Sequence, residues 1–495
     1  MLLALAVHTV GINRVFLPNA EGTATGIPVM HAVNFVRYGP LASGFAAILN
    51  TGQVEPKNWV LYAHHPPLIP FLIAGVYALF GISEWSTRLI PVFFTLASTA
   101  LLYLIALRRF GPFVAFWAGF FYSCVPITVA FGGMPDYVNT QVVFFMLVVI
   151  ETYLRWYETR QQLWLCTLSL SALLGALSDW PIFFPGVVLY GHFLLRCPEL
   201  SFKAKLVPGL IMSLLFLSLI VWAESAGQGR SILDAIYART IAGTDPGDLA
   251  KQMHAIITYN IVELHTSAVS LLALVFIGMV IFNHLTRNWT QILRYEAPIL
   301  LTITAALYLI FALTGNFQHP WWSVLVTAPV SLAAALSVWA LRNLTNQSVI
   351  RLLIPLGIGA LFLNLSIPAA YDEISMRWKH ARTDAYTLKE LGAVIKSISR
   401  PDEGVLSSDM SWDPTLWFYS DRQLRPAVNT ITKLNESLGP GPYPLRDWYS
   451  QPDGPPPRWF VMPPHHRATF QELADELDAR FSRYDLNGYW VYRLF

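Results

Sequence analysis

Apolar segments separated by short polar stretches fill the first three quarters of the chain. Candidate spans lie at 1–16, 87–107, 112–131, 140–154, 163–178, 182–195, 206–223, 262–283, 297–314, 321–340 and 349–369. The hydrocarbon core of a bilayer needs about 20 apolar residues in a helix. The pattern therefore predicts a polytopic α-helical membrane protein with about eleven transmembrane helices.

The apolar stretch 66–80, which follows "YAHH", is short for a span. A run of this length is more often interfacial or re-entrant. Proline suits the first helical turn and restricts the residue before it. Pro66 and Pro67 should therefore mark where an external loop ends and a juxtamembrane helix begins. This places His64 and His65 at the boundary between membrane and water.

The basic residues support this count of spans. If 66–80 does not cross, one side receives the loops with Arg108/Arg109, Arg155/Arg160, Arg196/Lys203/Lys205, Arg287/Arg294 and Arg342/Arg351. An excess of Lys and Arg marks the cytoplasmic side. The other side then receives a long first loop, about 17–86. Because the number of crossings is odd, the C-terminal segment lies on that side as well.

The hydropathy pattern changes at about residue 370, where charges and Pro/Gly clusters become frequent. "TLKELGAVIKSI" has helical periodicity, and "GVLSS", "RPAV", "RWFVM" and "YWVYRLF" are typical of strands. We expect a transmembrane module over 1–369 and a soluble extracytoplasmic α/β domain over 370–495. Asp409, Trp412 and Asp413 are the most notable polar group of that domain, and they equally fit an ordinary turn and cap.

Composition agrees with this assignment. Hydrophobic residues make up 54% of the chain and charged residues 13%, about half the charged share of a soluble domain. A net charge of +2 without a basic run gives no indication of nucleic acid. The three cysteines, all in or beside apolar segments, form neither a disulfide framework nor a CxxC metal motif.

Seven ionisable residues are expected at the outer ends of helices. They are Glu21, His31, His64, His65, Asp136, Asp179 and His319. Such groups at membrane edges are costly unless they line a cavity, so they are functional candidates by default. They are far apart in sequence, but the predicted topology lets them converge on one outward-facing cavity.

The carboxylates have more than one possible role. Glu21, just outside the first span, could act as general base for an acceptor hydroxyl or be a solvated loop residue. Asp136 in "GGMPDYVN" could act in catalysis, bind a divalent metal or a substrate hydroxyl, or cap the next helix. Asp179 in "LSDWP" could bind substrate or cap the following helix.

The histidines and tryptophans also have alternatives. His64 and His65 could bind a phosphate when protonated or a metal when neutral, and His319 in "QHPWW" is expected at the same depth. Two histidines with Asp136 or Glu21 would be a reasonable site for a divalent metal such as Mg²⁺, Mn²⁺ or Zn²⁺. Trp321 fits either an interfacial aromatic belt or a platform for a sugar or lipid.

Several motifs resemble the polytopic glycosyltransferases of the GT-C fold, of the protein O-mannosyltransferase and aminoarabinose transferase type. In that pattern an "HPPL" or "KPPL" element begins a juxtamembrane helix, followed by "E-W-x-x-R-L-x-P" and a span that ends in "RR-x-x-G". Here these elements are His65–Leu68, Glu84–Pro91 and Arg108–Gly111. The similarity is good over about 17–155 and weaker beyond.

The resemblance implies a polyprenyl-phosphate sugar donor and transfer outside the cytoplasm, to a lipid, glycan or protein acceptor. A metal requirement would depend on the subfamily. The family's catalytic first-loop carboxylate corresponds to Glu21 and the second-loop acid to Asp136. Where aminoarabinose transferases have "EKPP", this chain has "HHPP", so Lys57, Arg37 or a protonated histidine would have to bind the phosphate.

Two other classes of function stay open at this point. A transporter or flippase without chemistry would be favoured by inverted repeats and interrupted helices, and we find no convincing internal repeat. A structural membrane protein whose external domain binds partners is harder to reconcile with several ionisable groups at helix ends. We therefore predict a multi-pass membrane glycosyltransferase of the cell (inner) membrane that acts by an inverting displacement.

Overall fold

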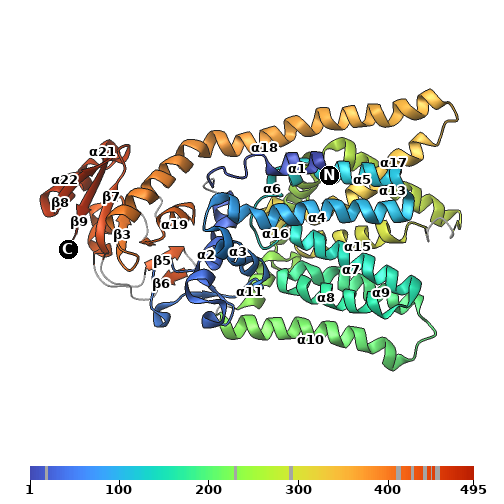
Figure 1. The fold of residues 1–495 in the computed structure, drawn as a ribbon, viewed down its shortest axis with the longest axis horizontal. Coiled ribbons are helices and arrows are strands. Elements are labelled where there is room, and N and C mark those ends of the chain that lie inside the picture. The colour runs from blue at the N-terminus through green and yellow to red at the C-terminus, as the bar shows by residue number, and fades with distance from the viewer. Residues whose placement is uncertain are drawn as a thin grey trace.

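The computed structural model in Figure 1 describes most of the chain. The described backbone covers residues 1–16, 20–227, 231–288, 294–408, 414–424, 428–438, 443–446, 449–451 and 457–494. Within it, the side chains of 20–25, 375–386, 414, 443–446 and 449–451 lie outside the described residues. A helical module forms one end of the molecule and a mixed α/β part forms the other.

The helical module begins with two helices that flank the first loop and continues as a bundle. Its helices are α1 (Leu2–Thr9), α2 (Ala20–Tyr38), α3 (Leu68–Phe80), α4 (Glu84–Phe110), α5 (Pro112–Cys124), α6 (Pro126–Phe131), α7 (Thr140–Thr159), α8 (Gln162–Ser178), α9 (Phe183–Arg196), α10 (Phe202–Ala226), α11 (Ile232–Arg239), α12 (Pro246–Ala255), α13 (Ser267–Leu285), α15 (Glu296–Phe311), α16 (Leu313–Gln318), α17 (Thr327–Arg342) and α18 (Ser348–Ile398). Short 3-10 turns η1 (Pro40–Ser43), η2 (Pro56–Asn58), η3 (Trp180–Ile182), η4 (Ile241–Gly243) and η6 (Pro320–Val326) and a π-helical segment (Ile256–Glu263) join them.

The protein is a multi-pass helical membrane protein. Five described helices are long and apolar enough to cross a bilayer: Glu84–Phe110, Phe202–Ala226, Ser267–Leu285, Pro320–Arg342 and Ser348–Ile374. Four shorter apolar helices lie in the described part of the chain. One of them is α3, which has 13 residues, a length that agrees with the interfacial helix predicted there. The number of eleven spans stays a prediction, because the shorter helices do not reach the usual spanning length by themselves.

Local sequence explains the ends of α4. Ser83 accepts a hydrogen bond from the backbone N–H of Ser86 and completes a capping box at the start of the helix. Arg108 and Arg109 occupy its last turn, where positive charge favours the helix dipole. Gly111 then ends the helix with a φ of 91°, a backbone conformation that favours glycine.

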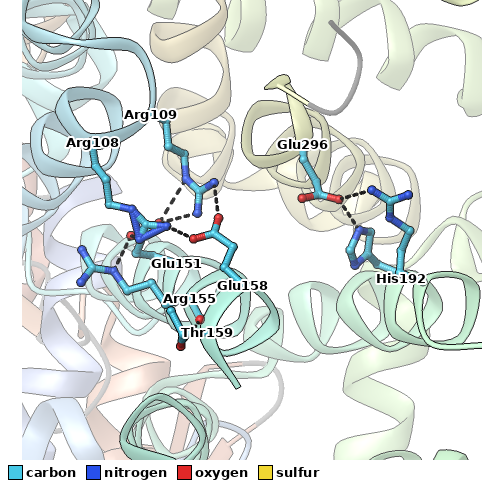
Figure 2. Close-up of polar contacts among 9 residues, drawn as sticks. Arg108, Arg109, Glu151, Arg155, Glu158, Thr159, His192 and Glu296 are labelled. Carbon is cyan, nitrogen blue, oxygen red and sulfur yellow. Dashed lines mark hydrogen bonds and ion pairs between the residues drawn. The ribbon is translucent and has the colours of Figure 1, made fainter. Parts of the chain in front are cut away.

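Ion pairs join α4 and α7 near their C-terminal ends (Figure 2). Arg109 pairs with Glu151 and Glu158 of α7, each with an N–O distance of 3.1 Å, and Arg108 pairs with the same two carboxylates. Nearby, His192 of α9 bonds Glu296 of α15. Arg108, Arg155 and Arg196, from three of the predicted basic loops, thus take part in these ion pairs.

The C-terminal part contains a five-stranded sheet with the strand order β4-β3-β7-β9-β8. The strands are β3 (Gly404–Ser407), β4 (Gln423–Leu424), β7 (Pro457–Met462), β8 (Ser482–Leu486) and β9 (Tyr489–Arg493). β3 is parallel to β4 and β7, and β9 is antiparallel to β7 and β8. β5 (Tyr443–Arg446) and β6 (Tyr449–Gln451) form a separate hairpin.

The sheet of the C-terminal part is surrounded by short helices. They are α19 (Pro414–Ser420), α20 (Ile431–Ser437), α21 (His466–Thr469) and α22 (Gln471–Arg480). Three of the four predicted strands appear as β3, β7 and β9. Most of "RPAV" lies outside the described residues, and so do Asp409, Trp412 and Asp413.

One helix joins the two parts. α18 has 51 residues and runs from the bundle into the α/β part without a break (Figure 1), so the last predicted span and the "TLKELGAVIKSI" helix are one element. The first loop also contacts the α/β part. The backbone N–H of Gln53 donates to the carbonyl of Pro401 over 2.7 Å. At Gly52, a Cβ atom would lie 2.7 Å from the same oxygen, so only glycine fits there.

Candidate functional site

A short hairpin places the two histidines of "HHPP". β1 (Ala47–Ile48) pairs antiparallel with β2 (Leu61–Tyr62), and the histidines follow β2 directly. The side chain of Asn34 on α2 donates to the carbonyls of Ile48 and Asn50, over 2.7 and 3.0 Å, and fixes the hairpin on that helix. The two prolines then start α3, as the sequence predicts.

His65 lies in a fixed orientation. Its Nδ1 is 2.9 Å from Oδ2 of Asp179, and its ring stacks on Tyr137 with the centroids 4.4 Å apart and the planes 9° from parallel. Tyr137 is itself 3.0 Å from Nδ1 of the buried His31. Asp179 is buried, and its other oxygen accepts the backbone N–H of Trp180 over 2.6 Å. Asp179 therefore both caps the next turn and orients the imidazole.

Asp136 lies in the turn between α6 and α7 and is also buried. Its Oδ2 accepts the indole N–H groups of Trp321 and of Trp322, the latter over 3.3 Å. Its Oδ1 accepts the backbone N–H of Tyr137 over 2.7 Å. Burial raises the pKa of Asp136 to about 6, although these hydrogen bonds and nearby His65 act in the opposite direction.

A cavity of about 270 Å³ opens beside His65 and Asp179. Its polar lining comes from loops and helix ends: His64, His65, Asp179, Arg239 and Thr240. Its apolar walls come from α9, α10 and α15 and include Phe183, Phe184, Val187, Phe216 and Phe311. The site thus offers ionisable groups and an extended apolar surface in one space. We call it the head-and-tail cavity.

Arg239 is the one fixed cation among the described residues that line this cavity. It is the last residue of α11, and its guanidinium lies 5.9 Å from the centre of the Trp322 ring. Nη1 donates to the carbonyl of Ala235 over 3.4 Å. Nε is buried, and no described residue accepts a hydrogen bond from it. A buried guanidinium donor of this kind fits an anionic ligand group.

The structure brings several of the predicted residues together and leaves others apart. His64, His65 and Asp179 line the cavity, while Asp136 and Trp321 lie directly behind its Trp322 wall. The ring of His319 packs against both tryptophans, with centroid distances of 5.0 and 4.8 Å. These residues come from four separate segments of the chain.

Two residues predicted to bind the phosphate do not reach the cavity. Lys57 is 75% exposed and pairs with Glu55 over 2.7 Å on the surface of the first loop. Arg37 pairs with Asp421 of the α/β part over 2.6 Å. Both assignments followed from position in the first loop, but that loop continues outward to the α/β part before it returns at β2. Glu21 lies in the first turn of α2, and its side chain is outside the described residues.

The predicted metal ligands do not form a common donor set. Within the described residues, no three His, Cys, Asp or Glu side chains could hold one ion. Trp321, Trp322 and Tyr137 occupy both oxygens of Asp136, and Nδ1 of His65 faces Asp179. His319 contacts the tryptophans instead. The residues Asp136, His65 and His319 therefore do not fit a metal site, and we assign no metal step to them.

Sequence reasoning missed Tyr137 and Arg239, and it did not anticipate the hydrogen bond that Trp180 makes. Trp180 donates its indole N–H to the carbonyl of His64 over 2.6 Å and so ties the histidine corner to the Asp179 turn. Tyr137 follows Asp136 directly and could have been noticed for that reason. Arg239 is in a polar loop with many equivalent residues, and no local pattern distinguishes it.

Comparisons with known proteins agree with this architecture. A sequence model of the family described as dolichyl-phosphate-mannose-protein mannosyltransferase matches residues 64–222, which include His64, His65, Asp136 and Asp179. An uncharacterized protein of Aquifex aeolicus (strain VF5) is 26% identical over 216 residues. That match spans 43% of this chain and 40% of the relative's length.

Solved structures match over a longer part of the chain. ArnT from Cupriavidus metallidurans, bound to undecaprenyl phosphate, superposes with a TM-score of 0.61 at 14% identity over 100% of this chain and 97% of that one. The chain has a GT-C fold. The oligosaccharyltransferase of Archaeoglobus fulgidus in complex with Zn and sulfate gives a TM-score of 0.57 at 14% identity, over 99% of this chain and 72% of that one.

These matches confirm the resemblance to GT-C glycosyltransferases of the protein mannosyltransferase and ArnT type. A third structure with this fold, AglB from Archaeoglobus fulgidus with an inhibitory peptide and a dolichol-phosphate, has a TM-score of 0.52 at 13% identity, over 100% of this chain and 74% of that one. Together the comparisons show the fold of the whole chain and a family match over residues 64–222.

Proposed function

We propose that this protein transfers a sugar from a polyprenyl-phosphate donor to an acceptor hydroxyl on a lipid, glycan or protein. The head-and-tail cavity carries the proposal, because it joins a buried cation and oriented ionisable groups to a wide apolar surface. A polyprenyl-phosphate sugar has the same combination of a charged head and an apolar tail. Solved structures with this fold bind undecaprenyl phosphate and dolichol-phosphate, which supports a donor of that class.

The apolar walls suit the isoprenoid tail of the donor. Phe216 on α10 and Phe311 on α15 line the cavity, and Val187 on α9 is 54% exposed there. Removing apolar surface from water is worth about 25 cal/mol per Å². A few isoprene units packed on these rings therefore supply much of the donor's affinity.

Arg239 and His65 suit the donor phosphate. An arginine can give two parallel hydrogen bonds to phosphate oxygens, and the buried Nε of Arg239 has no acceptor among the described residues. His65 lines the same cavity with one nitrogen already held by Asp179. Positive charge and N–H donors at this position would stabilise the negative charge that develops on the leaving phosphate.

The transfer is a single inverting displacement with Glu21 as the general base. The acceptor oxygen attacks the anomeric carbon while the bond from that carbon to the phosphate oxygen breaks and its electron pair stays on the phosphate. Glu21 takes the proton of the attacking hydroxyl. Asp136 acts as a positioning residue, because both of its oxygens hold N–H groups of Trp321, Trp322 and Tyr137.

The active end of the bundle faces outward in this proposal. The basic clusters around Arg108, Arg109 and Glu151 lie at the opposite end, which the positive-inside rule assigns to the cytoplasm. The α/β part then lies on the extracytoplasmic side of the inner membrane, next to the donor site. This orientation gives the enzyme access to donors that have already crossed the bilayer.

The donor site is tested by binding of undecaprenyl phosphate to the full-length protein in nanodiscs. Arg239→Ala should weaken binding at least tenfold, since a charged hydrogen-bonded contact contributes about 1.5–3 kcal/mol. Arg351→Ala, on the first turn of α18 beside Thr345, is the matched control and should bind normally. Equal affinity of wild type and Arg239→Ala would remove the proposed phosphate site.

The base is tested by turnover with lipid-linked sugar donors. Glu21→Gln should lower kcat by a factor of about 10²–10⁴ and leave undecaprenyl phosphate binding intact. A folded Glu21→Gln protein with full activity would exclude Glu21 as the base.

A further inference from the structure

A second cavity, of about 250 Å³, lies where the helical module meets the α/β part. We call it the joint pocket. It is lined by one face of α2, by the start of α4, by the outer part of α18 and by α19, which lie side by side at this junction in Figure 1. None of its lining residues belongs to the head-and-tail cavity.

The joint pocket carries an excess positive charge. Its lining contains two ion pairs that each join the two parts of the molecule: Arg37 with Asp421, and Glu84 with Lys389, both with N–O distances of 2.6 Å. Lys396 also lines the pocket, and no carboxylate in the described part of the chain pairs with it. Three cations therefore face two carboxylates, and one lysine ammonium is available to a ligand.

Aromatic side chains of α19 form a second part of the lining, the aromatic face, and the Lys389 ammonium lies 5.3 Å from the centre of its Tyr419 ring. Trp417, Phe418 and Tyr419 are consecutive on α19, and all three line the pocket. Tyr419 is fixed because its hydroxyl donates to Glu84 over 3.1 Å and accepts the backbone N–H of Phe16 over 3.0 Å. Rigid aromatic rings with a polar edge offer a flat contact to the C–H face of a pyranose, and a few charged groups then fix its orientation.

We propose that the joint pocket binds an anionic saccharide, namely a sugar unit that carries a phosphate or carboxylate. A neutral sugar would leave Lys396 without a partner, and a bare phosphate would leave the aromatic face uncovered. Resting on the proposed function, the ligand is the sugar portion of the acceptor, since the donor occupies the other cavity. A ligand held here touches both parts of the molecule at once, beside the helix α2 that carries Glu21 in its first turn.

The proposal is tested by binding, without turnover. The full-length protein in nanodiscs is applied to three kinds of immobilised saccharide: neutral, phosphorylated and uronic-acid-containing. A fourth surface carries immobilised inorganic phosphate groups alone. We expect saturable binding to at least one anionic saccharide. Phosphorylated lipids and free glycans that share the sugar are compared as competitors, which distinguishes a membrane acceptor from a soluble one.

Two variants address the pocket directly. Lys396→Glu reverses the available charge, and Ile82→Trp fills the pocket from a residue that is 49% exposed and therefore tolerates the larger side chain. Each should weaken binding at least tenfold. The matched controls are Lys433→Glu on α20 and Leu79→Trp on α3, which is 78% exposed; neither residue lines the pocket, and both variants should bind normally.

The outcomes separate this proposal from the proposed function. Glu21→Gln and Arg239→Ala should keep saccharide binding, because neither residue lines the joint pocket. Absence of saturable binding, equal binding to neutral and anionic saccharides, equal binding to phosphate alone, or loss of binding in Arg239→Ala would each overturn the proposal. Binding that depends on Lys396 in a protein without transferase activity would support the pocket and contradict the catalytic assignment.

Discussion

Two histidine–carboxylate pairs occupy opposite ends of the helical bundle. At the active end, Nδ1 of His65 lies 2.9 Å from Asp179. At the other end, Nε2 of His192 lies 2.8 Å from Glu296 (Figure 2). The two imidazoles are equally exposed, at 12% each. The distance between the partners and the exposure of the imidazole therefore do not distinguish the pairs.

The two pairs differ in the hydrogen bonding of the second ring nitrogen of each histidine. In the His192 pair, Nδ1 is 2.7 Å from the hydroxyl of Tyr153, and the Arg196 guanidinium lies 3.2 Å from Glu296. In the His65 pair, Nε2 has no hydrogen-bond partner within the described residues, and the ring lines a cavity. A histidine whose two nitrogens are both engaged by neighbouring side chains has no ring nitrogen left for a ligand. A histidine with one nitrogen left for a ligand can take part in chemistry.

Among variants of the two pairs, the largest effect should come from His65→Ala. Loss of the imidazole removes a donor at the leaving phosphate, and such groups contribute about 10²–10³ in kcat. We expect kcat to fall about 100-fold while the unfolding temperature changes little. Steady-state kinetics and thermal unfolding in the same detergent check this. Unchanged kcat would place His65 with His192 as a structural residue.

Asp179→Asn should have the next largest effect. The amide can still accept the backbone N–H of Trp180 but no longer provides the charge that orients His65. We expect kcat to fall about tenfold with KM nearly constant, as for residues that orient a catalytic group. In a His65→Ala background the same change should have almost no further effect on kcat. Additive losses in the double variant would contradict a positioning role.

A comparison of Asp136 with Glu296 predicts how the stability of the protein depends on pH. Glu296 has Arg196 and His192 as partners, whereas both oxygens of Asp136 accept only N–H groups, and burial raises the pKa of Asp136 from 3.8 to about 6. A carboxyl with a raised folded-state pKa contributes stability that is complete below pH 4 and is lost as the pH rises through 6. The contribution is on the order of 2 kcal/mol. Thermal unfolding between pH 4 and 7 should show a smaller pH dependence in Asp136→Asn than in the wild type.

The smallest effect on activity should come from His192→Ala. Tyr153 loses its partner, but Arg196 still pairs with Glu296, so we expect a loss of about 1 kcal/mol in stability. Turnover per folded molecule should stay within about twofold of wild type. A 100-fold loss of turnover would mean that the two ends of the bundle are coupled.

The convergence of His64, His65, Asp136, Asp179, His319 and Trp321 was predictable from sequence. The predicted topology places the outer ends of the helices on the same side of the membrane. Charged groups at a membrane edge are costly unless they line a cavity, so these residues were expected to lie close together. Their individual roles were not predictable, because these depend on angles and partners. Asp136 and Asp179 look alike in the sequence, yet one holds three N–H groups and the other holds an imidazole.

Arg37, Lys57 and Arg239 are residues whose position relative to the cavity was not predictable from the sequence. Arg37 and Lys57 were considered as replacements for the lysine of the family's "EKPP" element, but they pair with Asp421 and Glu55 and do not line the head-and-tail cavity. Arg239 is about 170 residues away from His65 in the sequence and lines the same cavity. The path of a long loop depends on tertiary packing, and the local periodicity of the sequence does not predict it.

The unbroken helix α18 constrains how this protein can change in length. Each residue of an α-helix adds a rise of about 1.5 Å and a rotation of about 100°. One residue inserted near position 380 would swing the α/β part around the helix axis and separate Pro401 from Gln53 and Asp421 from Arg37. Insertions and deletions should therefore be tolerated in surface loops and be absent from the middle of this helix among descendants that keep the joint.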